Sequence, residues 1–598
     1  MSEYRAPLAD MTFVLNELAG LAEIATLPGF EEATPDTVAA ILDEASRFAT
    51  DVLDPLNASG DREGSRLLAD GVVKTPPGFR DAYLRYIENG WNGLTKPVEF
   101  GGQGLPQLVA AAVEEMWHAA NMAFDLCPLL TQGAIEAIDL CGTPEQKARF
   151  LPSMVAGTWT GTMNLTEPQA GSDLAAVRTR AVPQADGTYR LFGQKIFITF
   201  GEHDYTENII HLVLGRLPDA PEGVRGISLF IVPKVLVNAD GSLGVRNDVR
   251  CVSLEHKLGI HASPTAVLAY GDHGGATGYL VGEPNRGLEY MFIMMNLARF
   301  SVGMEGVGLS DRAYQHAVAY ARDRVQGRTL GGAAAGATII GHPDVRRMLM
   351  TMRAYTEAMR AIGCVTAAAM DRARRSRDAG ARKASQAFVD FMIPIVKGWC
   401  TETAQEVTSL GIQVHGGMGY IEETGAAQYF RDARIITIYE GTTGIQANDL
   451  VGRKTLRDGG AEARRIAQEA DGVARACATH ADPALAAIGR ALADSVRTMR
   501  HAIDWVVAEG GNEAATAYAG AVPYLKLCGL VTGGWQMARA ATIARKRLDR
   551  GEGDAAFDAA KIATACFYAE SLLPHAQSYL RAMTAGSAAA LALPIESF

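Results

Sequence analysis

The spacing of apolar residues changes twice along the 598-residue chain, and these changes restrict the folds that it can adopt. Up to about residue 155, apolar side chains recur at intervals of three and four residues. One such stripe consists of Val38, Ile41, Leu42, Ala45, Phe48 and Val52. Between about 160 and 280 the pattern alternates, with Ile227, Leu229 and Ile231 on one face. Helical spacing returns from about 281, so we expect a mainly α protein with a central β-domain, barrel-like in form.

The same changes divide the chain into four expected domains, because a chain of this length exceeds one compact core. They are an N-terminal helical domain (1–158), a middle β-domain (159–280), a helical bundle (281–453) and an additional C-terminal helical domain (454–598). The segment 330–338 reads as an exposed loop. In the last domain, glycine pairs at 510–511 and 533–534 read as helix breaks.

Several short segments carry local structural signals. Thr143, Pro144 and Gln146 have the arrangement of a capping box with proline at the first helical position. Asp-Gly pairs at 186–187 and 240–241 predict turns between strands. Pro343 precedes an apolar stripe and predicts a helix start.

Composition excludes some classes of function and location. A net charge of -11 gives no basic footprint for nucleic acid. No apolar run is long enough for a membrane span, and the acidic N-terminus resembles no signal peptide, so we expect a cytoplasmic protein. The eight cysteines form no CxxC pair, so we expect reduced, mostly buried thiols and no metal site.

Two segments at the start of the β-region suit a phosphate or a planar ring. The first, 163–173, combines Thr166, Gly171 and Ser172 in a polar stretch that could bind a pyrophosphate or could be an ordinary turn. The second, 193–199, predicts a strand in which Phe197 could stack on a ring and Thr199 offers a hydroxyl. Their proximity in sequence favours a joint binding role.

Two further segments lie in the helical bundle. Residues 413–420 contain a glycine cluster that permits close backbone approach to a ligand, without the strand-GxGxxG-helix order of a nicotinamide site. His415 within it reads as a structural side chain. In 438–446, Glu440 precedes a glycine and two threonines, and is either a charge at a helix N-terminus or a base beside a ligand.

Together these segments resemble the acyl-CoA dehydrogenase family over about residues 30–450, and the stretches at 90–106 and 320–324 add to the likeness. The resemblance implies FAD as cofactor. By position it implies that the cofactor-binding residues are Met163, Leu165, Thr166, Gly171, Ser172, Phe197, Ile198, Thr199, Arg324, Gln413, Gly416, Gly417 and Thr442. Arg324 and the Gln413 to Gly417 stretch match residues that reach FAD of a neighbouring subunit, so a homodimer or a larger homo-oligomer is implied.

The resemblance also assigns the chemistry. Glu440 matches the base that removes the α-proton of an acyl-CoA, while hydride leaves the β-carbon for the flavin. The family polarises the thioester carbonyl with the backbone N–H of this glutamate and a ribityl hydroxyl. The implied substrate-binding residues are Ser172, Asn296, Arg299, Tyr439 and Gly441. The chain departs from many relatives in having Phe197 for tryptophan, Asn296 for aspartate, and no Phe-Gly after Arg324.

The domain beyond 450, with the segments 255–267 and 278–292, is similar to a longer subgroup that includes 3-methylmercaptopropionyl-CoA dehydrogenases. This implies a short- or medium-chain acyl-CoA substrate and an electron-transfer flavoprotein as electron acceptor. Two alternatives stay open. An acyl-CoA oxidase would pass electrons to oxygen, and a non-catalytic acyl-CoA-binding scaffold would have kept only the fold.

Overall fold

The computed structural model describes residues 3–328 and 336–598. The expected loop at 330–338 therefore lies largely outside the described residues. The chain forms two compact units, one made of 1–46, 106–119 and 299–598, and the other of 47–105 and 120–298. Three of the four unit boundaries fall inside helices, namely α3 (Pro35–Phe48), α6 (Gln107–Cys141) and α8 (Gly287–Asp323).

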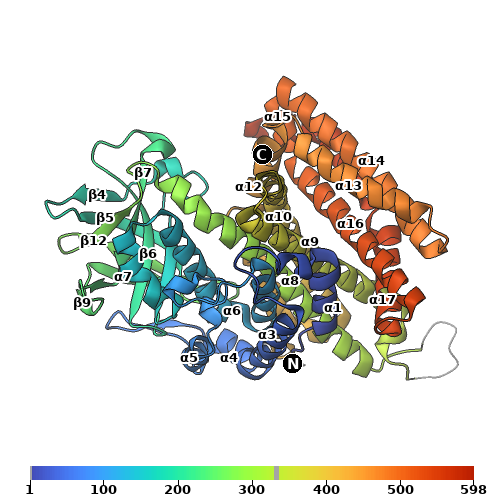
Figure 1. Ribbon diagram of the computed structural model, residues 1–598, viewed down its shortest axis with the longest axis horizontal. Coiled ribbons are helices and arrows are strands. Elements are labelled where there is room, and N and C mark those ends of the chain that lie inside the picture. The colour runs from blue at the N-terminus through green and yellow to red at the C-terminus, as the bar shows by residue number, and fades with distance from the viewer. Residues whose placement is uncertain (1–2, 329–335) are drawn as a thin grey trace. The chain divides into compact units, whose positions relative to one another are not determined.

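The second unit is built on an eight-stranded sheet, visible in Figure 1 around β6 and β7. Its strands are β3 (Trp159–Asn164), β4 (Arg180–Pro183), β5 (Tyr189–Thr199), β6 (Asn208–Arg216), β7 (Ile227–Pro233), β10 (Val249–Leu254), β11 (Thr265–Tyr270) and β12 (Ala276–Val281). The order is β10-β11-β5-β12-β7-β6-β3, with β4 paired to β5 and β6. The central β-domain predicted from the alternating pattern is confirmed.

The strands differ from the prediction in one respect. Every residue of β7 is buried, not only the face with Ile227, Leu229 and Ile231. Both faces of this strand are therefore covered, as in a sheet enclosed on both sides. Two small sheets lie outside the main one, β1 (Arg66–Leu67) with β2 (Val73–Lys74) and β8 (Val235–Val237) with β9 (Leu243–Arg246). The first lies within a part of the chain expected to be entirely helical.

Local signals in this unit are confirmed. The helix α7 (Pro144–Val155) begins with the predicted capping box, in which Thr143 Oγ1 accepts from Gln146 N and Gln146 Oε1 accepts from Thr143 N. The Asp-Gly pairs at 186–187 and 240–241 lie in the turns of the antiparallel pairs β4–β5 and β8–β9. Other helices of the unit are α4 (Asp54–Glu63) and α5 (Phe79–Glu88).

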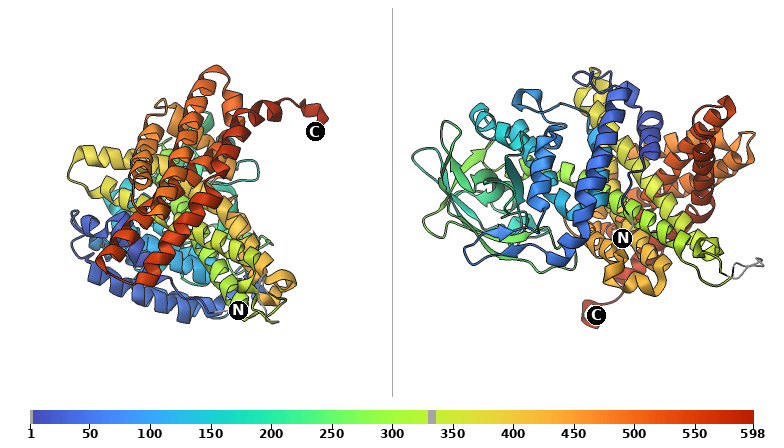
Figure 2. Two further views of the ribbon diagram at one scale, coloured as in Figure 1. Left: turned by 90° about the vertical axis from the view of Figure 1, so that its right-hand side faces the viewer. Right: turned by 90° about the horizontal axis from the view of Figure 1, so that it is seen from below.

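The first unit is helical. Its helices include α1 (Leu8–Phe13), α2 (Leu21–Ile24), α9 (Pro343–Arg375), α10 (Ala379–His415), α11 (Ala426–Ile436), α12 (Thr443–Val451), α13 (Ala461–Ala478), α14 (Pro483–Asn512), α15 (Ala514–Ala519), α16 (Ala521–Arg550), α17 (Ala555–Phe567), α18 (His575–Thr584) and α19 (Gly586–Leu591). The long helices α13, α14 and α16 run side by side in Figures 1 and 2. The predicted start of α9 at Pro343 is confirmed.

The predicted break at Gly533–Gly534 is wrong, because α16 continues through both residues. A Cβ at Gly533 would lie 2.5 Å from Tyr568 Oη, and one at Gly534 would lie 2.7 Å from Leu573 Cδ2. Glycine is needed here for close packing rather than for a turn. The pair at 510–511 lies in the last turn of α14, which ends at Asn512.

A buried ionic cluster joins distant parts of the first unit. Arg360 contacts Asp10 and Glu115, each at 2.5 Å, and Asp311 at 3.2 Å. Lys561 of α17 also contacts Asp10 and lies 2.9 Å from Glu357 of α9. These charges link the first helix, the central helices and the last domain.

All eight cysteines are free thiols and six of them are buried, as predicted. Among the described residues, no helix combines the length and apolarity needed to cross a membrane.

Candidate active site

In the sheet unit, the two predicted flavin segments lie against each other. Ile196 N donates to Thr166 O over 3.0 Å, and Lys195 Nζ donates to Leu165 O over 2.9 Å. The same ammonium lies 2.8 Å from Glu167 Oε1, with both side chains buried. Burial lowers the pKa of Lys195 to about 8, an effect that Glu167 opposes. An internal ion pair thus holds the loop after β3 against strand β5.

A β-bulge exposes Phe197. The pairing of β5 with β11 shifts register between Ala266 and Leu268, which face Ile198 and Lys195. Phe197 has a φ of 59° and an exposed fraction of 59%, while Ile198 is buried. Bulges re-aim side chains beside functional sites. Here the bulge presents an aromatic ring at the surface, on the strand that is bonded to the loop after β3.

The other predicted residues of this unit differ in their exposure. A Cβ at Gly171 would meet no atom within 4 Å, and Ser172 is exposed. Met163 is buried in β3, and Thr199 pairs with Thr265. Asn296 is exposed on α8. The loop therefore offers open backbone rather than packed side chains, as a ligand-contacting loop requires.

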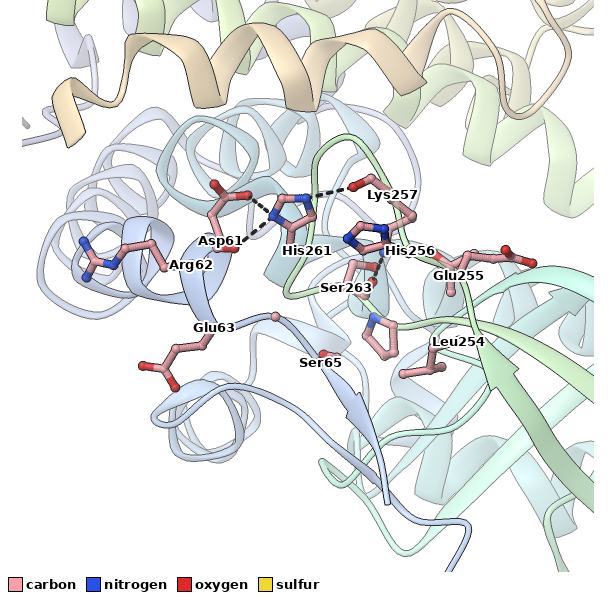
Figure 3. A pocket seen from close by; sticks show the side chains of 13 residues that line it. Asp61, Arg62, Glu63, Ser65, Leu254, Glu255, His256, Lys257, His261 and Ser263 are labelled. Atoms are coloured by element: carbon pink, nitrogen blue, oxygen red, sulfur yellow. Dashed lines mark hydrogen bonds and ion pairs between the residues drawn. The ribbon is translucent and has the colours of Figure 1, made fainter. Parts of the chain in front are cut away.

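A polar cavity of about 310 Å³ adjoins the end of β5, and its lining includes the segment 254–257 and the residues 263–265. Figure 3 shows His261 between Asp61 and the Lys257 carbonyl. Its Nδ1 lies 2.9 Å from Asp61 Oδ1. Phe200 N donates to Pro264 O over 2.8 Å, which fixes this wall to the strand that carries Phe197. The subgroup-like segment 255–267 thus lines a charged cavity beside the predicted flavin strand.

In the helical unit, Glu440 lies in the short turn between α11 and α12. Its φ is 55° and that of Gly441 is 94°, so both residues adopt the left-handed conformation. This conformation costs a non-glycine residue about 1–3 kcal/mol and occurs preferentially at functional sites. Thr442 then caps α12, because its Oγ1 accepts from Ile445 N over 3.3 Å.

Three side chains hold the carbonyls of this turn. Glu440 O accepts from Arg299 Nε over 3.2 Å and from Gln446 Nε2 over 3.1 Å. Gly441 O accepts from Lys397 Nζ over 2.6 Å. We call Arg299, Lys397 and Gln446 the carbonyl clamp. The clamp turns both carbonyls toward the protein interior, and in the described residues the Glu440 amide N–H has no acceptor.

The charges around the turn set the proton affinity of Glu440. Burial raises its pKa to about 7, while Arg299 and Lys397 favour the anion. Burial likewise lowers the pKa of Lys397 to about 8, against the attraction of Glu440 and Glu305. A carboxylate that titrates near neutrality suits a general base. Glu440 is therefore a candidate general base.

A second carboxyl group lies under the turn. Glu305 of α8 is fully buried and accepts a hydrogen bond from Tyr439 Oη. Burial raises its pKa to about 8, although Tyr439 and Lys397 oppose this rise. Glu305 is therefore largely protonated at neutral pH.

The remaining predicted cofactor residues lie at one end of α8 and α10. The ring of Tyr320 on α8 lies 4.4 Å from that of His415 at the end of α10. Arg324 follows one turn after Tyr320, and Gly416 and Gly417 directly follow His415. Both glycines have open space where a Cβ would lie, and Arg324 and Gln413 are exposed. His415 itself is buried.

Five residues of these sites had no role assigned from the sequence: Glu167, Lys195, Glu305, Lys397 and Gln446. Glu167 and Lys195 stand inside the two flavin segments, so an ion pair between the segments could have been proposed. Glu305 and Lys397 lie in long helices without any motif, and their spacing carried no signal.

Four family models match successive parts of the chain. They are "Acyl-CoA dehydrogenase, N-terminal domain" (35–158), "Acyl-CoA dehydrogenase, middle domain" (162–272), "Acyl-CoA dehydrogenase, C-terminal domain" (285–454) and "Acetyl-CoA dehydrogenase C-terminal like" (464–594). The last model covers most of the additional helical domain.

Curated relatives and solved structures agree with these matches. The chain is 52% identical to 3-methylmercaptopropionyl-CoA dehydrogenase of Ruegeria pomeroyi, over 95% of this chain and 96% of the relative. It is 36% identical to the broad-specificity linear acyl-CoA dehydrogenase FadE5 of Mycobacterium tuberculosis, over 96% of each. The fold is similar to that of an acyl-CoA dehydrogenase from Bacillus anthracis complexed with FAD, with a TM-score of 0.73, 21% identity, and coverage of 98% and 92%. The chain therefore belongs to the acyl-CoA dehydrogenase family.

Proposed function

We propose that this protein is an FAD-dependent acyl-CoA dehydrogenase that converts a short- or medium-chain acyl-CoA to the trans-2-enoyl-CoA, with Glu440 as the base. The observation that carries the proposal is the state of Glu440. Burial raises the pKa of its carboxyl group to about 7. The residue lies in a strained turn whose carbonyls accept hydrogen bonds from the clamp.

The α-proton of a thioester is weakly acidic, so its removal requires a base with raised proton affinity and a stabilised enolate. Glu440 takes this proton at its carboxylate. The free Glu440 amide can donate to the thioester oxygen as negative charge develops, which is the role of an oxyanion-hole donor. Arg299 binds the carbonyl of the same residue and so restrains the turn that presents this amide.

The residues present fit FAD. The exposed Phe197 ring and the open backbone at Gly171 offer a surface for a planar ring and a phosphate, and Gly416 and Gly417 offer a second open backbone. When bound, FAD supplies the acceptor for the hydride that leaves the β-carbon. The segments around Thr166, Ser172 and Thr199 would hold the cofactor, and Arg324 and Gln413 would reach the cofactor of a neighbouring subunit.

A homodimer follows from the same proposal. Next to Gly416 and Gly417, the side chains of Met418, Tyr420 and Ile421 have exposed fractions of 50%, 85% and 45%. Apolar side chains grouped in this way favour a protein interface. A second subunit covering them would also bring the open backbone to its partner's cofactor.

The substrate proposal rests on the relatives. The Ruegeria pomeroyi relative is named for 3-methylmercaptopropionyl-CoA and the mycobacterial one for linear acyl chains. An anaerobic screen of flavin bleaching with saturated acyl-CoAs of increasing length, and with the 3-methylmercapto compound, measures the preference. Fastest bleaching with long-chain acyl-CoAs would contradict the proposal.

Glu440→Gln tests the base. This variant should retain FAD and bind acyl-CoA, yet lose bleaching, because the amide cannot accept the proton. Glu513→Gln, the same change at an exposed position in the last domain, should bleach like wild type. Wild-type bleaching by Glu440→Gln would refute the assignment.

We propose an electron-transfer flavoprotein as electron acceptor. The test is to reduce the enzyme anaerobically with acyl-CoA and then admit air. A dehydrogenase should stay reduced until the electron-transfer flavoprotein is added. Rapid reoxidation with peroxide release would favour the oxidase alternative.

A further inference from the structure

We propose that Lys397 is a positioning residue for the reaction. Its ammonium holds the Gly441 carbonyl and supplies positive charge that favours the anion of Glu440. Helix α16 of the additional domain restrains the helix that carries Lys397. This inference rests on the proposed function, because it concerns the same base. It assigns a role in the site to Lys397, which lies outside every sequence motif, and to the additional C-terminal helical domain.

The contact of Lys397 is specific and buried. Lys397 has no exposed surface, and its Nζ lies 2.6 Å from Gly441 O. A buried lysine is disfavoured unless it is hydrogen-bonded and paired with opposite charge. The carboxylate of Glu440 provides that charge. Lys397 therefore interacts with the turn that carries Glu440 in two ways, by a hydrogen bond to the Gly441 carbonyl and by attraction to the Glu440 carboxylate.

The Gly441 carbonyl sets the orientation of the catalytic residue. Glu440 and Gly441 both have positive φ, so the turn between α11 and α12 has a shape that the chain alone does not favour. Arg299 and Gln446 fix the first carbonyl and Lys397 fixes the second. Without the ammonium, the Gly441 carbonyl would lose its donor, and the turn that carries Glu440 would lose one of its restraints.

The additional domain supports the helix that carries Lys397. A Cβ on the next residue, Gly398, would lie 2.6 Å from Leu525 Cδ2 of α16. A Cβ on Gly529 of α16 would lie 2.1 Å from Cγ of Trp399. The two helices therefore approach closely beside Lys397, at positions where only glycine leaves room. This contact restricts the movement of α10 at the position that the clamp requires.

The test compares Lys397→Met with Lys397→Arg in the FAD-loaded enzyme, with exposed Lys546→Met of α16 as the matched control. The first readout is the rate of anaerobic bleaching at saturating acyl-CoA, as a function of pH. Lys397→Met should bleach on the order of 100-fold more slowly, the loss expected when a catalytic group is misplaced. Because Lys397 favours the Glu440 anion, its loss should also move the midpoint of the rate profile to higher pH.

Lys397→Arg keeps the charge and should restore the midpoint even if the rate stays reduced. The second readout does not depend on turnover. It is the proton uptake on binding an alkyl-CoA thioether, measured by titration calorimetry in buffers of different ionisation enthalpy. Lys397→Met should change the pH dependence of this uptake, while Lys546→Met should match wild type.

Three results would overturn the inference. One is bleaching by Lys397→Met within about twofold of wild type. Another is a uniform loss of rate in both Lys397 variants with the pH midpoint unmoved, because that describes lost packing rather than positioning. The third is unchanged proton uptake by Lys397→Met, which decides the question even if this variant bleaches too slowly to measure. If Lys397→Met does not fold, Lys397→Gln takes its place in both readouts, because it keeps a hydrogen-bond donor without the charge. If wild type is not bleached by any acyl-CoA, the proposed function itself fails.

Discussion

Replacing Gly529 by alanine should destabilise the protein through the contact between α16 and α10. The added methyl would lie 2.1, 2.5 and 2.6 Å from Cγ, Cδ2 and Cβ of Trp399. Carbon atoms in favourable contact lie about 3.5–4.0 Å apart. The two helices must therefore separate, or the Trp399 ring must move, and that ring is buried.

The expected magnitude combines two opposing effects. Overpacking a filled core costs about 1–3 kcal/mol, and this overlap is with a rigid ring, which argues for the upper end. Alanine in a helix interior regains roughly 0.5–1 kcal/mol relative to glycine. The net change in the free energy of unfolding should be a loss of about 2 kcal/mol.

Gly472→Ala is the matched control. Gly472 is an exposed residue of α13, and a Cβ there would meet no atom within 4 Å. This variant should gain roughly 0.5–1 kcal/mol from helix propensity alone. Urea unfolding of the FAD-loaded enzymes, followed by circular dichroism, should give shifts of opposite sign. If Gly529→Ala is as stable as wild type, the described contact between α16 and α10 is wrong.

Two further predictions concern pH and the ionic cluster. Under the proposed function the anion of Glu440 is the active form. Because burial raises its pKa to about 7, kcat/KM for acyl-CoA should rise with pH, with a midpoint at about pH 7, and then level. Initial bleaching rates at low acyl-CoA measure this, and a midpoint near the ordinary carboxyl value would contradict it. Lys561→Met should lower the free energy of unfolding by about 2–3 kcal/mol, because Asp10 and Glu357 lose a buried partner but keep Arg360 and Arg353. Denaturant titration of this variant beside Lys546→Met measures the loss. A loss below about 0.5 kcal/mol would show that Lys561 does not stabilise the cluster.

Features that depend on neighbouring residues were predictable from the sequence. The capping box at Thr143 and Gln146 needs only a hydroxyl, an amide and their spacing, and the structure has both bonds. The turns at 186–187 and 240–241 depend on Asp-Gly pairs between alternating segments. The order of helical, β and helical regions follows from periodicity, which reflects which face of each element is buried.

Features that depend on distant residues were not predictable. The glycines at 533–534 have the composition of a helix break, but they fit a crossing with Tyr568 and Leu573. Whether glycine ends a helix or lets another element approach depends on the neighbour, which the local sequence does not contain. The exposed position of Phe197 likewise depends on a bulge against β11, a strand far along the chain.

The turn at Glu440 shows why the catalytic role needed more than its own motif. The segment 438–446 specifies a glutamate, a glycine and a helix cap, which allow two interpretations. The turn is held by partners on other helices: Lys397 donates to a carbonyl 44 residues away, and Tyr439 donates to Glu305 at a separation of 134 residues.

These contacts also explain why so much unfavourable structure gathers at one turn. A left-handed glutamate, a buried lysine and a buried second carboxyl group each oppose folding when taken alone. Together they compensate one another, since the lysine satisfies a carbonyl and offsets the charge of Glu440, while Tyr439 satisfies one oxygen of Glu305. Such an arrangement is stable only if the helices that carry the partners are themselves fixed. The close crossing of α16 with α10 at Gly398 and Trp399 provides that rigidity beside Lys397. By the role proposed for Lys397, the additional domain thereby contributes to the chemistry of a carboxylate that it does not supply.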